Sequence, residues 1–484
     1  MLYVIIFLYI KVDSNSTCLY IEGMSIMKIE EIVTILREKL SHKQVTTNET
    51  IRSQHGKDES YHREHLPDIV VFPHTTGQVS KVLAFANEEK IPVTPFGLGS
   101  SLEGHVIPYE GGISIDFSEM NNILEIRDKD LLVRVQPGIT RTQLNDKLKR
   151  YGLFFSVDPG ADATIGGMAA TNASGTTSVK YGIMRDQVAD LEVVLADGTI
   201  IHTGSLAGKS ASGLHLNGLF VGSEGTLGCI TELTLKVQGL PEHVLAARAN
   251  FSDIKDATEA VIAIMQAGIP IARVELVDEV SIEQINQHSD VSFPVAPTLF
   301  MEFHGNEAGL QQDVEFMESI VEDFQCEEII FEADHAKRLK LWEARHQLAY
   351  SYIHGYPGKK LMVTDVCVPI SELGNAILFA REELNKTGLA GGIVGHVGDG
   401  NFHVLLMIDM ENANEVSVAD TYNEKLVMHA LDKGGTCTGE HGVGVGKQKY
   451  QQQEHGEAYK LMQHLKRAVD PNNILNPGKL IKLD

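Results

Sequence analysis

Residues 67–104 read PDIVVFPHTTGQVSKVLAFANEEKIPVTPFGLGSSLEG, and this stretch constrains the fold more than any other. It opens with an apolar run, Ile69 to Phe72, of the length of a buried strand. Thr75 and Gln78 then have the three-residue spacing of a helix capping box. The apolar positions behind them recur with the helical period, at Val79, Val82, Leu83 and Ala86. Because an extended segment follows at residues 91–96, the stretch predicts a strand, a helix and another strand, the βαβ unit of an α/β sheet.

The chain on the C-terminal side of this unit continues to alternate between strands and helices. Apolar runs predict strands at residues 113–117 and 131–135, and a helix is expected around residues 140–151. Asp197-Gly198 lies between two apolar segments, which predicts a β-hairpin closed by a two-residue turn. A strand at residues 231–237 completes this sheet-based part of the chain.

A second pattern begins after Gly239-Leu-Pro241. Its elements are expected in the order strand 246–251, helix 254–266, strand 272–277, strand 298–303, helix 307–324 and strand 327–331. This β-α-β-β-α-β order is typical of a second sheet with its helices on one face. From about residue 445 the chain is expected to be helical, then extended, and to pack back on the first domain. We therefore divide the chain into an N-terminal segment with a helix (1–63), a first domain (64–241), a second domain (242–444) and a returning C-terminal segment (445–484).

The composition is that of a soluble globular protein, and it limits the classes of function. The 484 residues include 41 Lys and Arg against 65 Asp and Glu, a formal net charge of −24. A general nucleic-acid binder is excluded, because neutralising phosphate requires a basic surface. Five scattered cysteines share no CxxC spacing, which argues against an iron–sulfur relay and favours a reducing compartment. We expect a cytoplasmic location, with peripheral attachment to a membrane as the alternative.

The first ten residues are apolar but do not suit a membrane anchor. Ten residues are too few to cross a bilayer, and no basic region precedes them as in a secretory signal. Translation is therefore expected to begin at Met24 or Met27, just before a helical apolar pattern. A buried N-terminal strand is the alternative.

Two glycine-rich loops offer backbone N–H groups that side chains do not obstruct. Gly97-Leu-Gly-Ser-Ser101 follows a predicted strand, but no helix pattern follows it, so it is not a dinucleotide-binding GxGxxG fingerprint. Gly166-Gly167 begins a second run of small residues that reaches Ser174. Such loops suit a pyrophosphate held by backbone amides at a nest or a helix start. Ordinary turns have the same composition and are the alternative.

His396 and His403 lie on either side of a second Asp-Gly pair, Asp399-Gly400. If this pair forms a two-residue type I′ turn, the two histidines are direct cross-strand partners with Cβ atoms ~5 Å apart. That separation suits two ligands of one divalent metal ion. The alternative is a pair of histidines stacked in a hydrogen-bonded core.

Two further candidate site residues occur in Gly439-Glu440-His441-Gly442, within a run of glycines. Since positions without Cβ are costly unless a close approach requires them, this density favours a site over a flexible surface loop. Glu440 is predicted to be the third metal ligand, and His441 a general base beside it. Arg345, close to the only tryptophan, is a candidate to bind a substrate carboxylate; a helix-surface arginine is the alternative.

Eight motifs, taken in order between residues 60 and 480, resemble the FAD-linked 2-hydroxy acid dehydrogenases of the vanillyl-alcohol oxidase superfamily. They are Pro67-Asp-Ile-Val-Val-Phe-Pro73, Pro95-Phe-Gly-Leu-Gly-Ser-Ser-Leu-Glu-Gly104, Asp158-Pro-Gly160, Thr164-Ile-Gly-Gly-Met-Ala-Ala-Thr-Asn-Ala-Ser-Gly175, Gly222-Ser-Glu-Gly-Thr-Leu-Gly228, Gly395-His-Val-Gly-Asp-Gly-Asn-Phe-His403, Gly439-Glu-His-Gly442 and Leu475-Asn-Pro-Gly478. Within that family, Trp342-Glu-Ala-Arg-His346 and Thr364-Asp-Val-Cys-Val-Pro369 are most similar to the cytochrome-linked D-lactate dehydrogenases and the FAD-binding subunit of glycolate oxidase.

The resemblance implies an α+β fold, in which a two-subdomain FAD-binding domain carries a ferredoxin-like α+β cap domain. It also implies noncovalent FAD, since the superfamily's covalent histidine aligns near Ser100 and His105 lies several residues further on. The residues that it implies for FAD binding are Pro95, Gly97, Leu98, Gly99, Ser100, Ser101, Gly160, Thr164, Gly167, Ser174, Gly175, Glu224, Ile230 and Asn476.

The same resemblance implies the reaction. His396, His403 and Glu440 would bind one divalent metal ion (Zn, Mn or Fe), with His441 as catalytic base and Arg345 as catalytic carboxylate anchor. A small D-2-hydroxy acid, with D-lactate favoured, would be oxidised to the 2-oxo acid by hydride transfer to flavin N5. An external acceptor, which is a cytochrome, a quinone or a partner subunit, would then take the electrons.

One departure from the family pattern bears on the substrate. Relatives that act on 2-hydroxyglutarate carry a lysine and an asparagine where this chain has Val363 and Leu405, which favours a monocarboxylate.

The alternative within the family is a glycolate oxidase subunit in a multi-subunit complex. A metal-dependent hydrolase with Glu440 as base and a non-catalytic flavin-binding or metal-binding module are the alternatives from other classes. A homodimer is compatible with the resemblance.

Overall fold

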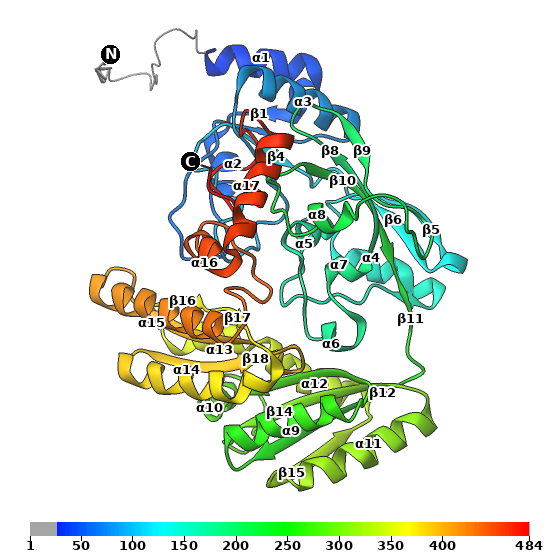
Figure 1. Ribbon diagram of the computed structural model, residues 1–484, viewed down its shortest axis with the longest axis vertical. Helices are drawn as coiled ribbons and strands as arrows, with labels where there is room; N and C mark the ends of the chain where they lie inside the picture. The colour runs from blue at the N-terminus through cyan, green and yellow to red at the C-terminus, as the bar shows by residue number, and fades with distance from the viewer. Residues whose placement is uncertain (1–26, 484) are drawn as a thin grey trace.

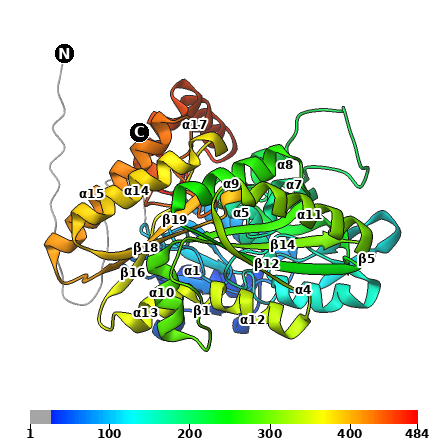
Figure 2. The same ribbon diagram turned by 90° about the horizontal axis from the view of Figure 1, so that it is seen from below.

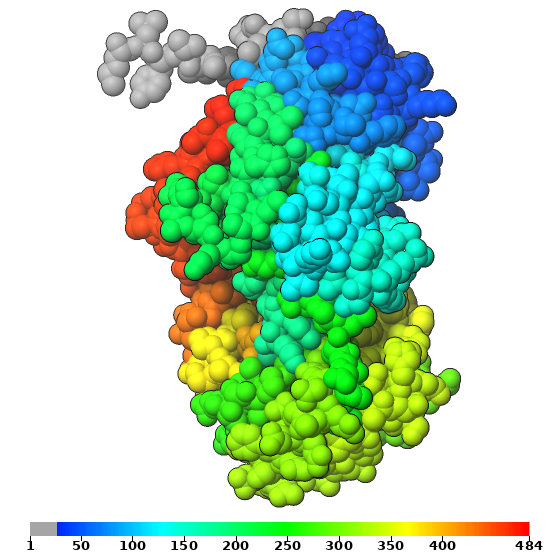
Figure 3. Space-filling view, turned by 90° about the vertical axis from the view of Figure 1, so that its right-hand side faces the viewer, coloured from blue at the N-terminus to red at the C-terminus, as the bar shows by residue number. Residues whose placement is uncertain are grey.

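The computed structural model describes residues 27–483, which form two lobes stacked along the long axis of the molecule (Figure 1). The first lobe contains residues 27–239 together with the C-terminal segment, and the second lobe contains residues 243–432. In the space-filling view the second lobe, green to yellow, lies below the first (Figure 3). The expected translation start at Met24 and the alternative N-terminal strand lie outside the described residues.

A four-stranded sheet forms the upper part of the first lobe. Its order is β1 (Val45–Thr46), β2 (Ile69–Val71), β4 (Ile113–Asp116) and β3 (Val93–Phe96), flanked by α1 (Ile29–Lys39) and α2 (Glu49–Gln54). β2 and β3 are both parallel to β4, and α3 (Thr76–Glu89) connects them, which confirms the predicted βαβ unit, with β4 between its strands. The predicted inward positions of α3 are fully buried: Val79, Val82, Leu83 and Ala86.

The predicted capping box at the start of α3 forms only in part. Thr75 Oγ1 accepts a hydrogen bond from Gln78 N at 3.3 Å, as expected of an N-cap. The Gln78 side chain does not return to the N-cap residue but accepts from His74 N at 2.7 Å.

The lower part of the first lobe is a five-stranded antiparallel sheet. Its order is β5 (Ile123–Arg127), β6 (Leu132–Val135), β10 (Cys229–Lys236), β8 (Val188–Val194) and β9 (Ile200–His202). The helices of this part are α4 (Arg141–Leu148), α5 (Ile165–Thr171), α6 (Ser178–Tyr181), α7 (Met184–Gln187) and α8 (Asn217–Phe220), and β7 (Leu153–Phe154) pairs with β11 (Gln238–Gly239). One apolar core joins this sheet to α4 and α5.

The predicted hairpin at Asp197-Gly198 forms, but its loop is longer than two residues. β8 pairs with β9 at Val194 and Ile200, whereas a two-residue loop would align Ala196 with Thr199. A type I′ turn requires a positive φ at both central residues; Gly198 has one (φ 85°) and Asp197 does not. A three-residue loop that ends in a left-handed glycine therefore replaces the expected turn.

The second lobe is built on an eight-stranded sheet. The predicted elements appear in order as β12 (His243–Phe251), α9 (Ile254–Gln266), β13 (Ile271–Val277), β14 (Thr298–Gly305), α11 (Glu307–Glu322) and β15 (Cys326–Glu332). Their strands lie side by side as β15-β12-β14-β13, the ferredoxin-like arrangement. The sheet continues through β18 (Ala390–Gly395), β19 (Asn401–Ile408) and β16 (Lys360–Val363), and β17 (Val366–Cys367) pairs with β19.

The two predicted helices, α9 and α11, lie on one face of this sheet as expected, and helices that were not predicted cover both faces (Figure 2). On one side lie α9, α11, α14 (Leu373–Thr387) and α15 (Ala413–Asp432), and on the other α10 (Glu279–His288), α12 (His335–His346) and α13 (Leu348–Gly355). Side chains alternate along β19, so Val404 faces the first group and Leu405 the second. His403 shares the parity of Leu405 and therefore belongs to the second face.

The C-terminal segment, red in Figure 3, returns to the first lobe through α16 (Gln451–His455) and α17 (Glu457–Val469). The buried ammonium of Lys466 donates to the carbonyl of Thr226 at 2.8 Å. Further on, Leu475 forms a parallel bridge with Val93, with Val93 N donating to Ile474 O at 2.7 Å. The segment thus extends the four-stranded sheet beyond β3.

The described part of the chain contains neither a membrane-spanning helix nor a disulfide. Between residues 27 and 483, no helix combines the length and the apolar character needed to cross a bilayer. The four cysteines in this range are free: Cys229, Cys326, Cys367 and Cys437.

The docked C-terminal segment predicts a specific loss of stability. Leu475 is completely buried, so Leu475→Ala should lower the free energy of unfolding by about 2–5 kcal/mol through lost burial and a residual cavity. Leu461→Ala is the control, because that side chain is 60% exposed on α17. Urea denaturation of both variants tests the docking, and equal losses would contradict it.

Candidate active site

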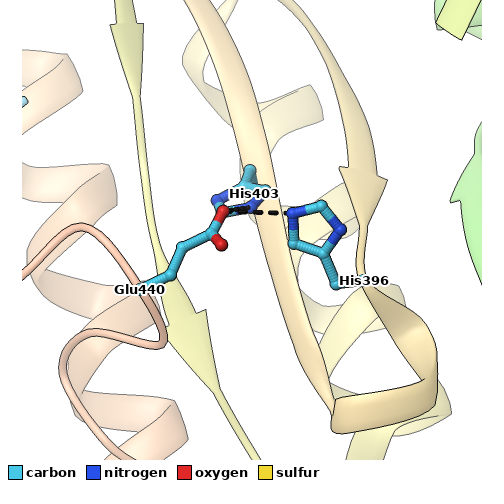
Figure 4. A group of neighbouring side chains, drawn as sticks. All are labelled: His396, His403 and Glu440. Atoms are coloured by element: carbon cyan, nitrogen blue, oxygen red, sulfur yellow. Dashed lines mark hydrogen bonds and ion pairs between the residues drawn. The ribbon is translucent and has the colours of Figure 1, made fainter. Parts of the chain in front are cut away.

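His396, His403 and Glu440 converge between the lobes (Figure 4). One possible ligand atom from each lies within 4.8 Å of the other two. Glu440 Oε1 is 3.1 Å from His396 Nε2 and 3.1 Å from His403 Nε2. The two histidines come from the end of β18 and from β19, and Glu440 from the loop that follows α15. Two imidazole nitrogens and a carboxylate oxygen in this arrangement are ligands that Zn, Mn and Fe accept.

The histidines meet by a different route from the predicted hairpin. In the observed register, His403 is the cross-strand partner of Val394, and not of His396. Gly400 has a positive φ of 78° but Asp399 does not, so the type I′ turn is again absent. A 3₁₀ turn over Val397–Asp399 carries His396 back toward the sheet. The two rings still lie 5.5 Å apart between centroids, nearly perpendicular at 82°.

A buried carboxylate, Glu275 on β13, joins His396 to Arg345. Glu275 Oε1 lies 2.6 Å from His396 Nδ1, and Glu275 Oε2 accepts a hydrogen bond from Arg345 at 2.8 Å. The Arg345 side chain on α12 is 11% exposed, so the surface alternative for this residue is wrong. Its Nε is buried without a partner among the described residues.

The charges around His396 act on its protonation. Burial alone would lower its pKa, but the carboxylates of Glu275 and Glu440 outweigh burial and raise the pKa well above its ordinary value.

The sequence alone did not reveal Glu275 as a residue of the site. Its one signal was a charged residue inside an otherwise apolar strand pattern, Ile271 to Val277.

His441 lies beside the three converging side chains. Its ring stacks on that of His403, with centroids 5.0 Å apart and planes 9° apart. Burial, the largest effect, lowers its pKa to about 4, although Asp365 acts in the opposite direction. The Nδ1 atom is buried and has no partner in the described structure. His441 is therefore neutral at pH 7 and can accept a proton.

The predicted cofactor loops meet in the first lobe. A Cβ on Gly97 would lie 2.5 Å from Thr164 Oγ1, and one on Gly167 would lie 3.0 Å from the same atom. A Cβ on Gly225 would lie 2.9 Å from Pro95. The loop after β3, the start of α5 and the loop before β10 are thus in contact, and a glycine at each of these three positions makes room for the side chain of Thr164 or Pro95.

Several side chains implied for FAD binding have protein partners instead. Ser174 Oγ donates to Glu440 Oε2 at 2.7 Å, and Ser101 Oγ donates to Asp58 at 2.9 Å. Asn476 Nδ2 donates to the backbone oxygens of His105 and Glu224. The remaining residues of the set lie on the same three loops, on the approach to α5, between α5 and α6, or at the start of β10: Leu98, Gly99, Ser100, Gly160, Gly175 and Ile230.

Two family models match the chain. The model described as "FAD binding domain" matches residues 67–204, and the one described as "FAD linked oxidases, C-terminal domain" matches residues 240–480.

Curated relatives match over most of their length. The probable D-lactate dehydrogenase, mitochondrial, of Danio rerio is 43% identical over 459 residues, which span 94% of this chain and 92% of that protein. The D-lactate dehydrogenase (cytochrome), mitochondrial, of Arabidopsis thaliana is 43% identical over 456 residues, 94% of this chain and 80% of that protein. Glycolate oxidase subunit GlcD of Bacillus subtilis is 34% identical over 424 residues, 87% and 90% of the two chains.

Solved structures share the fold at lower identity. p-Cresol methylhydroxylase superposes with a TM-score of 0.80 at 21% identity, covering 95% of this chain and 98% of that one. Alkyldihydroxyacetonephosphate synthase superposes with a TM-score of 0.73 at 20% identity, covering 96% and 88%. The likeness concerns the fold alone, and it confirms the expected fold class.

The Arg345–Glu275 pair gives a prediction about stability. Arg345→Met removes the guanidinium from a buried carboxylate and leaves only His396 beside it, so the free energy of unfolding should fall by about 3–5 kcal/mol. Adding Glu275→Gln to that variant should recover part of the loss, because the uncompensated charge is removed.

The matched control is Lys337→Met on the same helix. The Lys337 side chain is 70% exposed in its ion pair with Glu332, so this change should cost less than about 1 kcal/mol. Urea denaturation compares the variants, and a double variant less stable than Arg345→Met would contradict the pairing.

Proposed function

The chain belongs to the FAD-linked oxidases of the vanillyl-alcohol oxidase superfamily, and on that premise we propose that it oxidises a small D-2-hydroxy acid, D-lactate in the first place, to the 2-oxo acid. The observation that carries the proposal is the meeting of His396, His403 and Glu440 with a neutral, unpartnered histidine, His441, beside them. The relatives at 43% identity are named D-lactate dehydrogenases, which favours D-lactate over glycolate.

The first lobe fits FAD because three loops that carry glycines, at Gly97, Gly167 and Gly225, meet in it. A Cβ on Gly97 or Gly167 would crowd Thr164 Oγ1, so these positions favour glycine, whose unobstructed amide groups would approach a pyrophosphate. FAD supplies, when bound, the acceptor for the two electrons and the C2 hydrogen of the substrate. Noncovalent binding is supported by His105, whose buried ring lies 3.4 Å from Glu224 and next to Gly442.

The three converging side chains fit a divalent metal ion, which would withdraw charge from the substrate hydroxyl when bound. Glu275 supports this role, since a carboxylate on the far nitrogen of His396 fixes the ring orientation and makes it a better ligand. Thr364 does the same for His403, whose Nδ1 lies 3.1 Å from the Thr364 carbonyl.

The roles of the other residues follow from their partners. We assign to His441 the role of the base that accepts the proton of the substrate hydroxyl, because its Nδ1 has no partner in the described residues. Arg345 would hold the substrate carboxylate with the guanidinium edge that Glu275 leaves free. Val363 and Leu405 are cross-strand partners on β16 and β19, and their apolar side chains would leave a second carboxylate unpaired.

The hydrolase alternative has less support. A general base needs a free oxygen, but Glu440 directs Oε1 toward both histidines and accepts from Ser174 with Oε2.

The electron acceptor is external to the chain, and a cytochrome fits the name of the Arabidopsis thaliana relative. A quinone or partner subunit, a homodimer and a cytoplasmic location stay predictions.

The substrate class can be tested by anaerobic reduction of the bound flavin. D-Lactate should bleach the flavin absorbance fastest, glycolate more slowly, and L-lactate and D-2-hydroxyglutarate least, because chirality and the apolar Val363–Leu405 pair select against the last two. A flavin that no hydroxy acid bleaches would refute the oxidation, and faster reduction by D-2-hydroxyglutarate would refute the specificity.

The metal site and the base can be separated by two substitutions. His403→Ala should abolish bound metal and most turnover while FAD, which we place in the first lobe, remains. His441→Ala should retain both metal and FAD but lose ~10²-fold or more in turnover. Metal analysis and flavin content distinguish the cases. His429→Ala, on α15, is the control and should keep all three properties. Full metal occupancy in His403→Ala would refute the site.

A further inference from the structure

The active-site loop, defined as residues 438–446, carries Glu440 and His441 without forming a helix or a strand. Four of its nine residues are glycines: Gly439, Gly442, Gly444 and Gly446. Glycine loses more backbone freedom on folding than any other residue, so an ordered loop of this composition needs specific contacts to hold it.

One end of the loop is held by Asp365, from the second lobe. Asp365 Oδ2 accepts hydrogen bonds from the backbone N–H groups of Gly439 (2.9 Å), Glu440 (3.0 Å) and His441 (3.0 Å). The hydroxyl of Thr438 donates to the same oxygen at 2.6 Å. The Asp365 side chain is completely buried between β16 and β17. A single carboxylate oxygen therefore collects three successive amides, which sets the direction in which Glu440 and His441 project.

The other end is held by Glu224, from the first lobe. Glu224 Oε1 accepts from Val443 N at 2.7 Å, and Oε2 accepts from Gly444 N at 2.9 Å. Between the two anchored stretches, Gly442 has a φ of 85°, and a Cβ there would lie 2.6 Å from His105 Nε2. Both oxygens of Glu224 thus serve the loop, whereas the family resemblance implies a role in FAD binding.

A buried lysine, Lys447, links Asp365 to Glu103 of the first lobe behind the loop. Lys447 Nζ donates to the backbone oxygen of Asp365 at 2.8 Å and lies 3.4 Å from Glu103 Oε1 in the first lobe. Val445 N donates to the carbonyl of Glu103 at 2.9 Å. The loop is consequently held by Asp365 of the second lobe near one end and by Glu224 and Glu103 of the first lobe near the other, so its geometry depends on the assembly of the lobes.

We propose that Asp365 and Glu224 are positioning residues, one from each lobe, that together hold the active-site loop with Glu440 and His441 directed into one site. Neither carboxylate contacts substrate or cofactor in this assignment. The role of the loop in catalysis rests on the proposed function, but its fixation by two carboxylates does not.

Hydrogen exchange on the FAD-containing protein tests the fixation directly. Asp365→Asn should accelerate exchange of the amides at 439–441, and Glu224→Gln should accelerate exchange at 443–444, each by about tenfold or more, because charged acceptors are lost. With D-lactate, kcat should fall by ~10²-fold with KM changed less than about threefold, since the loop orients groups rather than binds substrate. FAD content should stay full in both variants.

The matched control is Asp278→Asn in the second lobe. Asp278 is also completely buried, accepts backbone N–H groups from Ser281 and Ile393, and pairs with Arg381. This variant should lose stability without faster exchange in the active-site loop. If Asp365→Asn does not fold, Thr438→Val replaces it, because that change removes one donor to Asp365 and should raise exchange at 439–441 to a smaller extent.

Two results would overturn the proposal. Loss of FAD from Glu224→Gln with unchanged exchange at 443–444 would assign Glu224 to the cofactor, and loop exchange in Asp278→Asn as fast as in Asp365→Asn would make the effect nonspecific. Failure of the proposed function has a different signature: the wild-type flavin is not reduced by D-lactate, yet the loop amides still respond to the two substitutions.

Discussion

The buried carboxylate of Glu275 is the interaction on which the arrangement of the site depends. A fully buried charge is tolerated only when it is paired and hydrogen-bonded, and Glu275 meets this condition by contacting Arg345 on one oxygen and His396 on the other. A helix, a strand and the end of a second strand are thereby joined around one side chain. Because His396 also faces Glu440, the position of the active-site loop depends on this chain of charges.

Strand alternation explains why these charges gather on one face. Along β13, Val274 and Leu276 enter the core beneath α9, so Arg273 and Glu275 project from the opposite face. On β14, Glu302 projects on the same side and lies 3.5 Å from Arg273. The polar face of the second lobe is the one that meets the first lobe.

Contacts between the lobes combine this polar face with an apolar contact, in which Val179 of α6 packs against the core of the second lobe. Arg273 reaches Asp158 of the first lobe at 3.2 Å, and its guanidinium lies 4.9 Å from the Trp342 ring. The hydroxyl of Tyr181 lies 2.8 Å from His304 Nδ1, and Lys180 donates to the His304 carbonyl. Directional contacts of this kind fix the relative orientation of the lobes, which a site assembled from both of them requires.

Local sequence alone determined the elements of this protein, and tertiary structure decided how their side chains meet. The βαβ unit, the order of elements along the ferredoxin-like part of the chain and the buried face of α3 follow from periodicity and capping, which depend on residues within one turn or one strand. Both Asp-Gly loops are longer than the predicted two residues, since neither Asp197 nor Asp399 adopts the positive φ that a two-residue turn needs. The partners of the site residues were beyond reach for another reason: Glu275 and His396 are 121 residues apart, and Glu224 and Val443 are 219 apart. No local pattern records such a contact, because it exists only after two lobes have folded and docked.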